Sequence, residues 1–263
     1  MTDSTQFNYK PNLESVQLCL ENYVRLMDDA EKVSSETQFA LYELALEELT
    51  KAWMLYFSYF MSIARSQSDE EAFFKAYFKE VNITEPTLSK VLSPQTFQAS
   101  NLPKEGIHSF ISLSQKLYEP DISSAFKTHS TKLKYLANLL RYLKLMLTIF
   151  KDEPNYKPSD RNKLVGKYMK VKEVDETRKR TVFENVINII DRFDIEKEDT
   201  NFEKLELLQR KKEEAFYTSI YGDMLITPRT RWFNNSDIKA LNDLLYIELV
   251  DEINVFIDTI LHK

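Results

Sequence analysis

Hydrophobic residues recur every three or four positions along most of the chain, which is the spacing of an amphipathic α-helix. The first such stripe follows Pro11 and Asn12 and consists of Leu13, Val16, Leu20, Val24 and Met27. Ser34 or Ser35 is a start signal for the second helix, and the run Ser68-Asp-Glu-Glu71 is a capping box for the third. The predicted helices span 12–32, 35–65, 72–81, 104–118, 122–150, 181–193, 201–225 and 236–262.

Composition favours the same fold class. The chain has 3 glycines in 263 residues, whereas glycine averages about 7% of residues in globular proteins. So few glycines do not supply the tight turns of a many-stranded β protein or a glycine-rich phosphate loop. The sequence therefore predicts an all-α protein.

The stretch 151–180 separates two helical blocks. It contains Pro154, Pro158 and Gly166 among many basic residues, and such residues interrupt helices. We therefore expect an antiparallel helical core at 1–150, a basic connecting segment at 151–180, and a helical C-terminal extension at 181–263 that packs on the core.

Several classes of protein are disfavoured. The single cysteine, Cys19, excludes an intramolecular disulfide and a Cys-rich zinc site, and its place in a hydrophobic pattern predicts a buried structural thiol. No HExxH or P-loop motif is present in the sequence, and neither of the two long predicted helices, 35–65 and 122–150, contains Glu-x-x-His, so no metal or cofactor is expected. The uncharged run 52–64 is shorter than the roughly 20 residues of a membrane span, and the polar N-terminus has no apolar signal core. We expect a soluble, cytoplasmic protein.

Charge is unevenly distributed along the chain. Residues 127–180 carry 15 Lys/Arg and 6 Asp/Glu, a net charge of +9, between flanking segments of −8 and −7. A basic middle segment is suited to an anionic partner such as RNA, and a solvated face paired with the acidic segments is the alternative interpretation. The candidate RNA-binding residues are Lys127, Lys167, Lys170, Lys172, Arg178 and Arg180.

Glu48 lies among the hydrophobic positions of the predicted helix 35–65. At about 100° per residue from Leu41, Glu48 falls at about 340°, inside the apolar arc, and Lys51 falls at about 280°, at its edge. Glu43, Glu47 and Thr50 fall on the side where solvent is expected. A carboxylate among hydrophobic residues is costly unless it is paired, and Lys51, three residues on, is the expected partner.

His129 occupies a hydrophobic stripe in the predicted helix 122–150 and is flanked by Lys127 and Lys132. If this helix packs on helix 35–65, then Glu48, Lys51, His129 and Lys132 converge. Such a cluster holds a histidine of tunable pKa, a carboxylate to orient it and ammonium groups to bind phosphate. It suits metal-free cleavage of RNA by its own 2′-hydroxyl, and it equally suits a buried polar network that fixes helix register.

Three segments carry short charged motifs. Residues 36–56, ETQFALYELALEELTKAWMLY, lead from a small-residue and Leu-rich segment into E-E-L-x-K-A. Residues 126–133 read FKTHSTKL, and residues 161–171, RNKLVGKYMKV, begin with Arg and end near a Tyr. These segments resemble the AbiV abortive-infection family, in which the second motif is H-K-x-K-L, and the resemblance covers residues 12–172.

The resemblance implies a HEPN-like helical bundle, a role in bacterial defence against phage, and a homodimer. Proteins of the HEPN superfamily are often metal-independent ribonucleases whose catalytic groups meet across the dimer. By position, Glu47, Glu48 and Lys51 match E-E-x-x-K, and His129 and Lys132 match the histidine and second lysine of H-K-x-K. Ser130 stands where the family usually has Lys.

The superfamily's ribonuclease signature, an Arg separated from a His by four to six intervening residues, is missing. Ile122, Ser123 and Ser124 occupy those positions before His129. Lysine does not reproduce the bidentate fork of arginine, so Lys127 and Lys132 are imperfect replacements. This departure keeps a non-catalytic function open.

Two functions follow from these observations. In the first, the protein is an anti-phage effector that cleaves RNA, with His129 as general base or acid, Glu48 orienting it, and Lys51 and Lys132 binding phosphate. In the second, a non-catalytic dimeric module sequesters an RNA, ribosomal or phage protein partner, and the buried charges only fix the core. A purely structural helical protein is a third interpretation, which leaves the motifs as coincidence.

Overall fold

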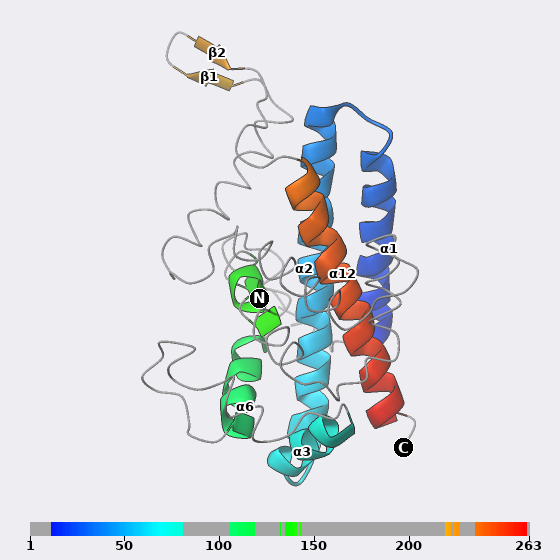
Figure 1. Cartoon of the computed structure of the whole chain (residues 1–263), viewed down its shortest axis with the longest axis vertical. Coiled ribbons are helices and arrows are strands. Elements are labelled where there is room, and N and C mark those ends of the chain that lie inside the picture. Colours follow the sequence, from blue (N-terminus) through cyan, green and yellow to red (C-terminus); the bar gives the residue numbers. More distant parts are fainter. Residues whose placement is uncertain are drawn as a thin grey trace, which may run out of the picture.

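A computed structural model of the chain describes residues 12–80, 106–118, 132, 135–140, 142–143, 219–221, 224–226 and 235–261. This part is all-α apart from one short hairpin (Figure 1). The helices are α1 (Leu13–Ala30), α2 (Ser35–Ser66), α3 (Glu70–Glu80), α6 (Gly106–Lys116) and α12 (Asn235–Phe256), which continues into a π-helical turn at Ile257–Leu261. The predicted fold class is confirmed at this level. The predicted division into 1–150, 151–180 and 181–263 stays a prediction, because both boundaries lie outside the described residues.

The helices begin at the predicted capping residues, with one adjustment. The side chain of Asn12 accepts a hydrogen bond from the backbone N of Ser15 at 2.9 Å, and Ser34 is the N-cap of α2. At α3 the capping oxygen belongs to Asp69, which accepts from the backbone N of Ala72 at 2.9 Å. The capping side chain is therefore one position later than the Ser68 of the predicted capping box, because the helix itself begins at Glu70.

Part of the predicted helix 122–150 is also described. Residues 132, 135–140 and 142–143 are all helical, and we call them the Lys132 helix. Lys132 contacts Glu47 of α2, and the ring of Tyr142 lies 5.0 Å from that of Phe57, centroid to centroid. From the first contact to the second, the residue numbers increase in both helices. The Lys132 helix therefore runs parallel to α2.

Helix α2 is the centre of the fold, and its neighbours differ in direction (Figure 1). It is about 48 Å long, at 1.5 Å per residue. α1 runs antiparallel to it through a short turn, and Gln38 donates across that turn to the carbonyl of Ala30 at 3.1 Å. α12 runs parallel to it: Trp53 donates from Nε1 to the carbonyl of Leu245 at 2.9 Å, and Tyr56 donates to that of Glu252 at 3.0 Å.

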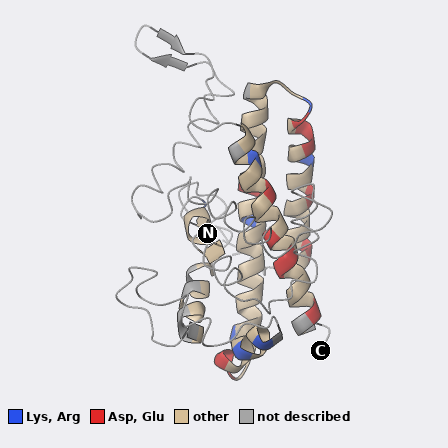
Figure 2. Ribbon diagram, viewed as in Figure 1, with Lys and Arg blue, Asp and Glu red and all other residues tan. Residues whose placement is uncertain are grey.

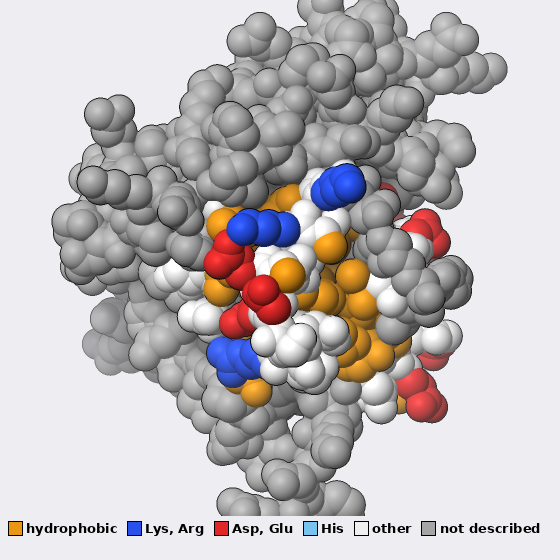
Figure 3. All heavy atoms as spheres, turned by 90° about the horizontal axis from the view of Figure 1, so that it is seen from below, with side chains coloured by type: hydrophobic (Ala, Val, Ile, Leu, Met, Phe, Trp, Pro, Cys, Tyr) orange, Lys and Arg blue, Asp and Glu red, His pale blue; other side chains and the backbone are white. Residues whose placement is uncertain are grey.

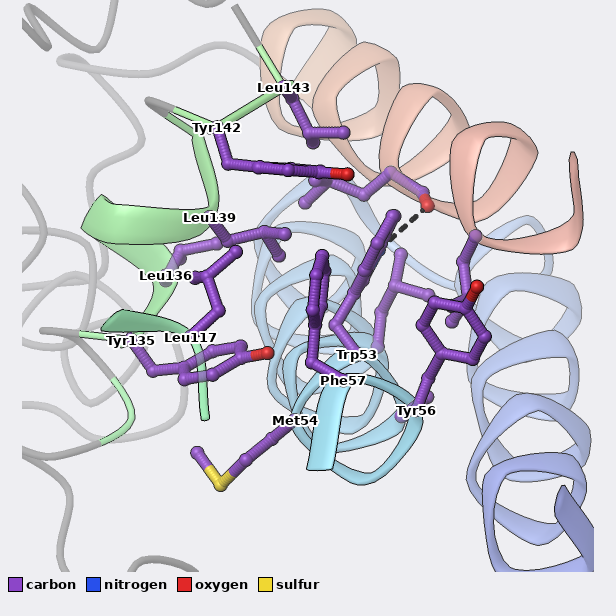
Figure 4. Packing of buried hydrophobic residues seen from close by; sticks show 14 of the residues in the cluster. Trp53, Met54, Tyr56, Phe57, Leu117, Tyr135, Leu136, Leu139, Tyr142 and Leu143 are labelled. Carbon is purple, nitrogen blue, oxygen red and sulfur yellow. Dashed lines mark hydrogen bonds between the residues drawn. The ribbon is translucent and has the colours of Figure 1, made fainter. Parts of the chain in front are cut away.

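The hydrophobic core surrounds α2 on several sides and includes α12. Figure 4 shows Trp53 and Phe57 directed between α12 and the Lys132 helix, with Leu139 and Tyr142 facing them. At the α3 end, Phe60 makes ring contacts with Phe73, Phe74, Tyr77 and Phe256. The core therefore joins segments from both ends of the chain, and α12 is packed into it along its length.

The buried face of α1 differs from the predicted stripe. Val16 is buried as predicted, but Val24 is 42% exposed, and Tyr23 and Leu26 are buried instead. The ring of Tyr23 stacks on Tyr246 of α12 at 5.0 Å. Because α1 packs against α12 as well as α2, its buried face is centred on Tyr23, which turns Val24 toward solvent.

The prediction of a helix at 201–225 is wrong where it can be tested. Residues Ser219–Tyr221 form β1 and Met224–Ile226 form β2, which pair antiparallel with Tyr221 opposite Met224. In the sequence, Gly222-Asp223 separates the strands, and a Gly-Asp pair between hydrophobic runs is typical of a two-residue hairpin. That signal outweighs the helical spacing. The predicted helix 181–193 lies outside the described residues.

Charged residues are distributed unevenly over the described helices. Acidic residues are spread along α1 and α12 (Figure 2), and Glu248, Asp251 and Glu252 of α12 are buried. The end of the molecule at α3 presents hydrophobic side chains beside basic and acidic side chains (Figure 3). None of the described helices combines the length and the apolar composition that a bilayer span requires.

Candidate functional site

The central part of α2 positions four charged side chains. Residues 41–56 consist largely of Leu, Ala, Glu and Lys, which are strong helix formers. They fold into uninterrupted helix, so Glu43, Glu47, Glu48 and Lys51 occupy fixed positions around one rigid axis.

Glu48 and Lys51 form the predicted ion pair. Nζ of Lys51 lies 2.5 Å from Oε1 of Glu48, and the two side chains are 22% and 19% exposed. The pair lies near Cys19 of α1, since both of its charges affect the pKa of that thiol. Burial is the main cause that raises the pKa of Cys19 to about 11, Glu48 raises it further, and Lys51 lowers it.

Cys19 therefore stays protonated near neutral pH and is a poor nucleophile. The thiol packs against the core but is only partly buried, so the prediction of a buried thiol holds only in part. The reason is the orientation of α1, whose buried face is centred on Tyr23.

Lys132 brings the second predicted motif to α2. Its Nζ lies 2.9 Å from Oε2 of Glu47, and the two side chains are 14% and 18% exposed. The expected packing of the two segments is therefore present, but Lys132 pairs with Glu47 and not with Glu48. Glu47 does not face solvent as expected, because the Lys132 helix packs over this side of α2.

Glu43 and Thr50 lie on the same side of α2 as Glu47. Both were expected in solvent, yet Glu43 is 3% and Thr50 is 2% exposed. Thr50 donates from its hydroxyl to the carbonyl of Leu46 at 2.7 Å. The expectation fails because α2 is not a two-sided amphipathic helix: α1, α12 and the Lys132 helix cover it on different sides.

The remaining predicted site residues lie outside the described residues. These are His129, Lys127, Lys167, Lys170, Lys172, Arg178 and Arg180. Of the four residues that were predicted to converge, Glu48 pairs with Lys51, whereas Lys132 pairs with Glu47. The two ion pairs lie on neighbouring sides of α2.

A second polar cluster joins the C-cap of α1 to α2 and α12. Glu31 pairs with Lys239, and its Oε1 accepts from the hydroxyl of Tyr42 at 2.8 Å. The hydrogen bond from Lys239, and then that from Tyr42, lowers the pKa of Glu31. Burial is the largest cause that raises the pKa of Tyr42, and the hydrogen bond to Glu31 is the second.

Asp243 lies one turn after Lys239. Burial raises the pKa of Asp243 to about 6, against the lowering effect of Lys239 and with a further increase from Glu31. No local sequence signal marks this cluster, since its members come from three separate helices.

A third polar group is the carboxylate of Glu252, which is buried at the α3 end. Its Oε2 accepts from the hydroxyl of Tyr77 at 2.8 Å. Burial is the first cause that raises the pKa of Tyr77 and of Tyr56 well above the usual range, and the charge of Glu252 is the second. These tyrosines therefore act as hydrogen-bond donors at physiological pH.

The chemistry available to these groups is electrostatic and acid–base. Within the described ranges, no set of three or more His, Cys, Asp and Glu side chains is placed to hold a metal ion. The Glu47–Lys132 pair offers a fixed ammonium beside a carboxylate, which is suited to positioning an anion or a titrating side chain.

Comparisons with known proteins add no assignment. No family model, no curated protein and no solved structure matches this chain.

Proposed function

We propose that the protein is an abortive-infection effector that acts on RNA or on translation. The observation that carries the proposal is the contact between Glu47 and Lys132 at 2.9 Å. It joins segments 36–56 and 126–133, which resemble two motifs of one defence family and are far apart in the sequence. Motifs that belong to one functional site are expected to lie together in the fold even when they are far apart in the sequence.

In the enzymatic form, the effector is a metal-independent ribonuclease of HEPN-like architecture. His129 is the general base or acid, Lys132 and Lys51 contribute positive charge for phosphate, and neighbouring carboxylates orient the histidine. The basic residues of 157–180 guide RNA, and homodimerisation completes the site. This form requires no metal and no cofactor.

A second candidate is a non-catalytic dimeric module that sequesters an RNA, ribosomal or phage protein partner. The observation that favours it is that Lys51 and Lys132 already contact carboxylates. An ammonium held by a carboxylate is less available to phosphate, and such pairs also serve to fix helix register.

Expression in bacteria, with and without phage, separates the two. Growth, plaque formation and total-RNA integrity are measured for wild type, for His129→Ala, and for His108→Ala as the matched control. The ribonuclease form predicts RNA fragmentation and protection that disappear in folded His129→Ala and persist in His108→Ala.

The binding form predicts protection with intact RNA that His129→Ala does not change. In that form, charge reversal at Lys167, Lys170, Lys172, Arg178 and Arg180 abolishes protection if the partner is RNA. A wild-type chain that neither protects nor arrests growth would refute both forms.

A further inference from the structure

The basic side chains that the structure describes fall into two groups. Most of them contact a carboxylate, and these are Arg25, Lys32, Lys51, Lys75, Lys132 and Lys239. Arg65 and Lys79 differ, because no carboxylate of the described residues forms an ion pair with either of them. Of these two, only Arg65 lies against an aromatic ring.

Arg65 is held by the ring of Tyr118 and by no acidic residue in the described part of the chain. It is exposed in the last turn of α2, and its guanidinium carbon lies 4.2 Å from the centre of that ring. An aromatic ring attracts a cation above its face and leaves the charge of the cation intact. The N–H groups of the guanidinium form no hydrogen bond with a described residue. They are therefore open to a ligand.

Tyr118 is a fixed support for this guanidinium. Leu117, the residue before it, is buried, and the backbone N–H groups of Leu117 and Tyr118 donate to the carbonyls of Ser114 and Gln115 at 3.0 Å and 3.3 Å. The side chain of Tyr118 packs against the hydrophobic core and stays partly exposed. A cation on such a support loses less conformational freedom on binding than a side chain in open solvent.

Stabilisation of the end of α2 does not require this arrangement. Any cation in the last turn of a helix interacts favourably with its terminal carbonyls, and a lysine without a ring would serve. Arg25 is the contrasting case, because its guanidinium donates to Asp29 at 3.0 Å and to Asn22 at 2.8 Å. Arg65 instead presents a planar cation, and the N–H geometry of such a cation matches phosphate oxygens.

We propose that Arg65, held on Tyr118, contacts the phosphate backbone of single-stranded RNA. The inference rests on the proposed function and deepens it, because it adds an RNA contact formed by the ends of α2 and α6. The chain has a net charge of −6, so its attraction for RNA depends on local cations that its own carboxylates do not neutralise. Arg65 meets this condition, whereas Arg25 does not.

Fluorescence anisotropy with the whole purified chain tests the contact. The probe is a fluorescein-labelled single strand of about 20 nucleotides. Its 2′-O-methyl sugars lack the hydroxyl that cleavage would need, so binding is measured separately from cleavage. We expect Arg65→Gln to raise the Kd at least about fivefold and to reduce the slope of log K against log salt by about 0.7.

Arg25→Gln is the matched control. It removes the same charge from another exposed arginine, but this charge is already paired with Asp29. We therefore expect its Kd to stay within about twofold of wild type. Its melting temperature and that of each other variant are measured alongside.

The ring and the guanidinium are tested separately. Tyr118→Phe keeps the ring and should bind like wild type, whereas Tyr118→Leu should bind more weakly. Arg65→Lys keeps the charge and should retain the salt slope, but it should bind more weakly because an ammonium lacks the fork of a guanidinium. A role confined to helix stability would change the melting temperatures and leave the salt slope unchanged.

The failure of the inference and the failure of the proposed function are distinguishable. Equal affinities of Arg65→Gln and Arg25→Gln, or losses that follow the melting temperature, would overturn the inference, and so would a wild type that does not bind the probe. Phage protection decides the proposed function independently. Protection without probe binding leaves the form with a protein partner, whereas binding without protection removes the proposed function and supports the RNA contact.

Discussion

Lys132 donates from Nζ to Oε2 of Glu47 over 2.9 Å, and the two residues are 85 positions apart in the chain. Both side chains are more than four-fifths buried. The contact therefore holds the Lys132 helix against α2 and assembles the centre of the proposed site. Its strength is open to direct measurement.

A double-mutant cycle on Glu47 and Lys132 measures this contact. Lys132→Met removes the ammonium from a mostly buried carboxylate, and we expect a loss of about 1.5–3 kcal/mol in the free energy of unfolding. Glu47→Met in the same chain is expected to recover part of that loss, because it removes the buried charge. Urea denaturation followed by circular dichroism gives the values, and strictly additive single effects would contradict a direct pair.

Trp53→Phe tests how α12 is attached to the core. The substitution removes the Nε1–H that Leu245 accepts and leaves a buried carbonyl without that donor. We expect a loss of about 1–3 kcal/mol in unfolding free energy. Met54→Leu, at an equally buried position, conserves volume and serves as the control, with an expected cost below about 1.5 kcal/mol. Equal stabilities for the two variants would rule out the proposed attachment.

Tyr77→Phe tests the buried hydrogen bond between α3 and α12. It removes the hydroxyl that donates to the carboxylate of Glu252, and a hydrogen bond to a charged group contributes about 1.5–3 kcal/mol. Tyr59→Phe alters a partly buried tyrosine at the same end of the molecule and should cost less. Thermal unfolding of both variants checks the difference, and the reverse order would argue against this contact.

Asp243 is expected to make the free energy of unfolding depend on pH. Its pKa of about 6 in the folded chain exceeds the ordinary value of 3.8, so folding is disfavoured when the carboxyl ionises. This cost is absent at pH values below about 4 and complete above about 6.

Asp243→Asn should therefore stabilise the protein at pH 7 and have little effect at pH 4. Because Asp243 is partly exposed, solvent screening reduces the expected gain to about 1 kcal/mol. Urea denaturation of both proteins at the two pH values measures the gain, and a larger stabilisation at pH 4 than at pH 7 would show that the sign is wrong.

The thiol of Cys19 should react slowly. Its pKa of about 11 leaves little thiolate at pH 8, and the thiolate is the reactive form. Modification by a disulfide reagent at pH 8 is expected to be about two orders of magnitude slower in the native protein than in urea. Because the chain has one cysteine, the colour change reports this residue alone. Equal rates in the two conditions would show that Cys19 is not protected.

Local structure was largely predictable from the sequence. The helical spacing and the caps at Asn12 and Ser34 predict α1 and α2 to within two residues at either end. Pairing of Glu48 with Lys51 was also predictable, since residues three apart are neighbours on any helix. These features depend on short stretches of chain, so the sequence contains the needed information.

The surroundings of each helix depended on tertiary structure. A hydrophobic pattern identifies one buried side of α2, but α1, α12 and the Lys132 helix cover it on different sides. Glu43 and Thr50 are therefore buried, and Glu47 is mostly covered, on a side that the pattern assigns to solvent. The same reason explains Val24, which the contact of Tyr23 with Tyr246 turns outward. The amino-acid sequence by itself determined that the segments of α1, α2, α3, α6 and α12 are helical, because that pattern is local, but it did not predict the strands Ser219–Tyr221 and Met224–Ile226. The tertiary structure decided which carboxylates those helices bury together, because burial depends on partners that are distant in the chain.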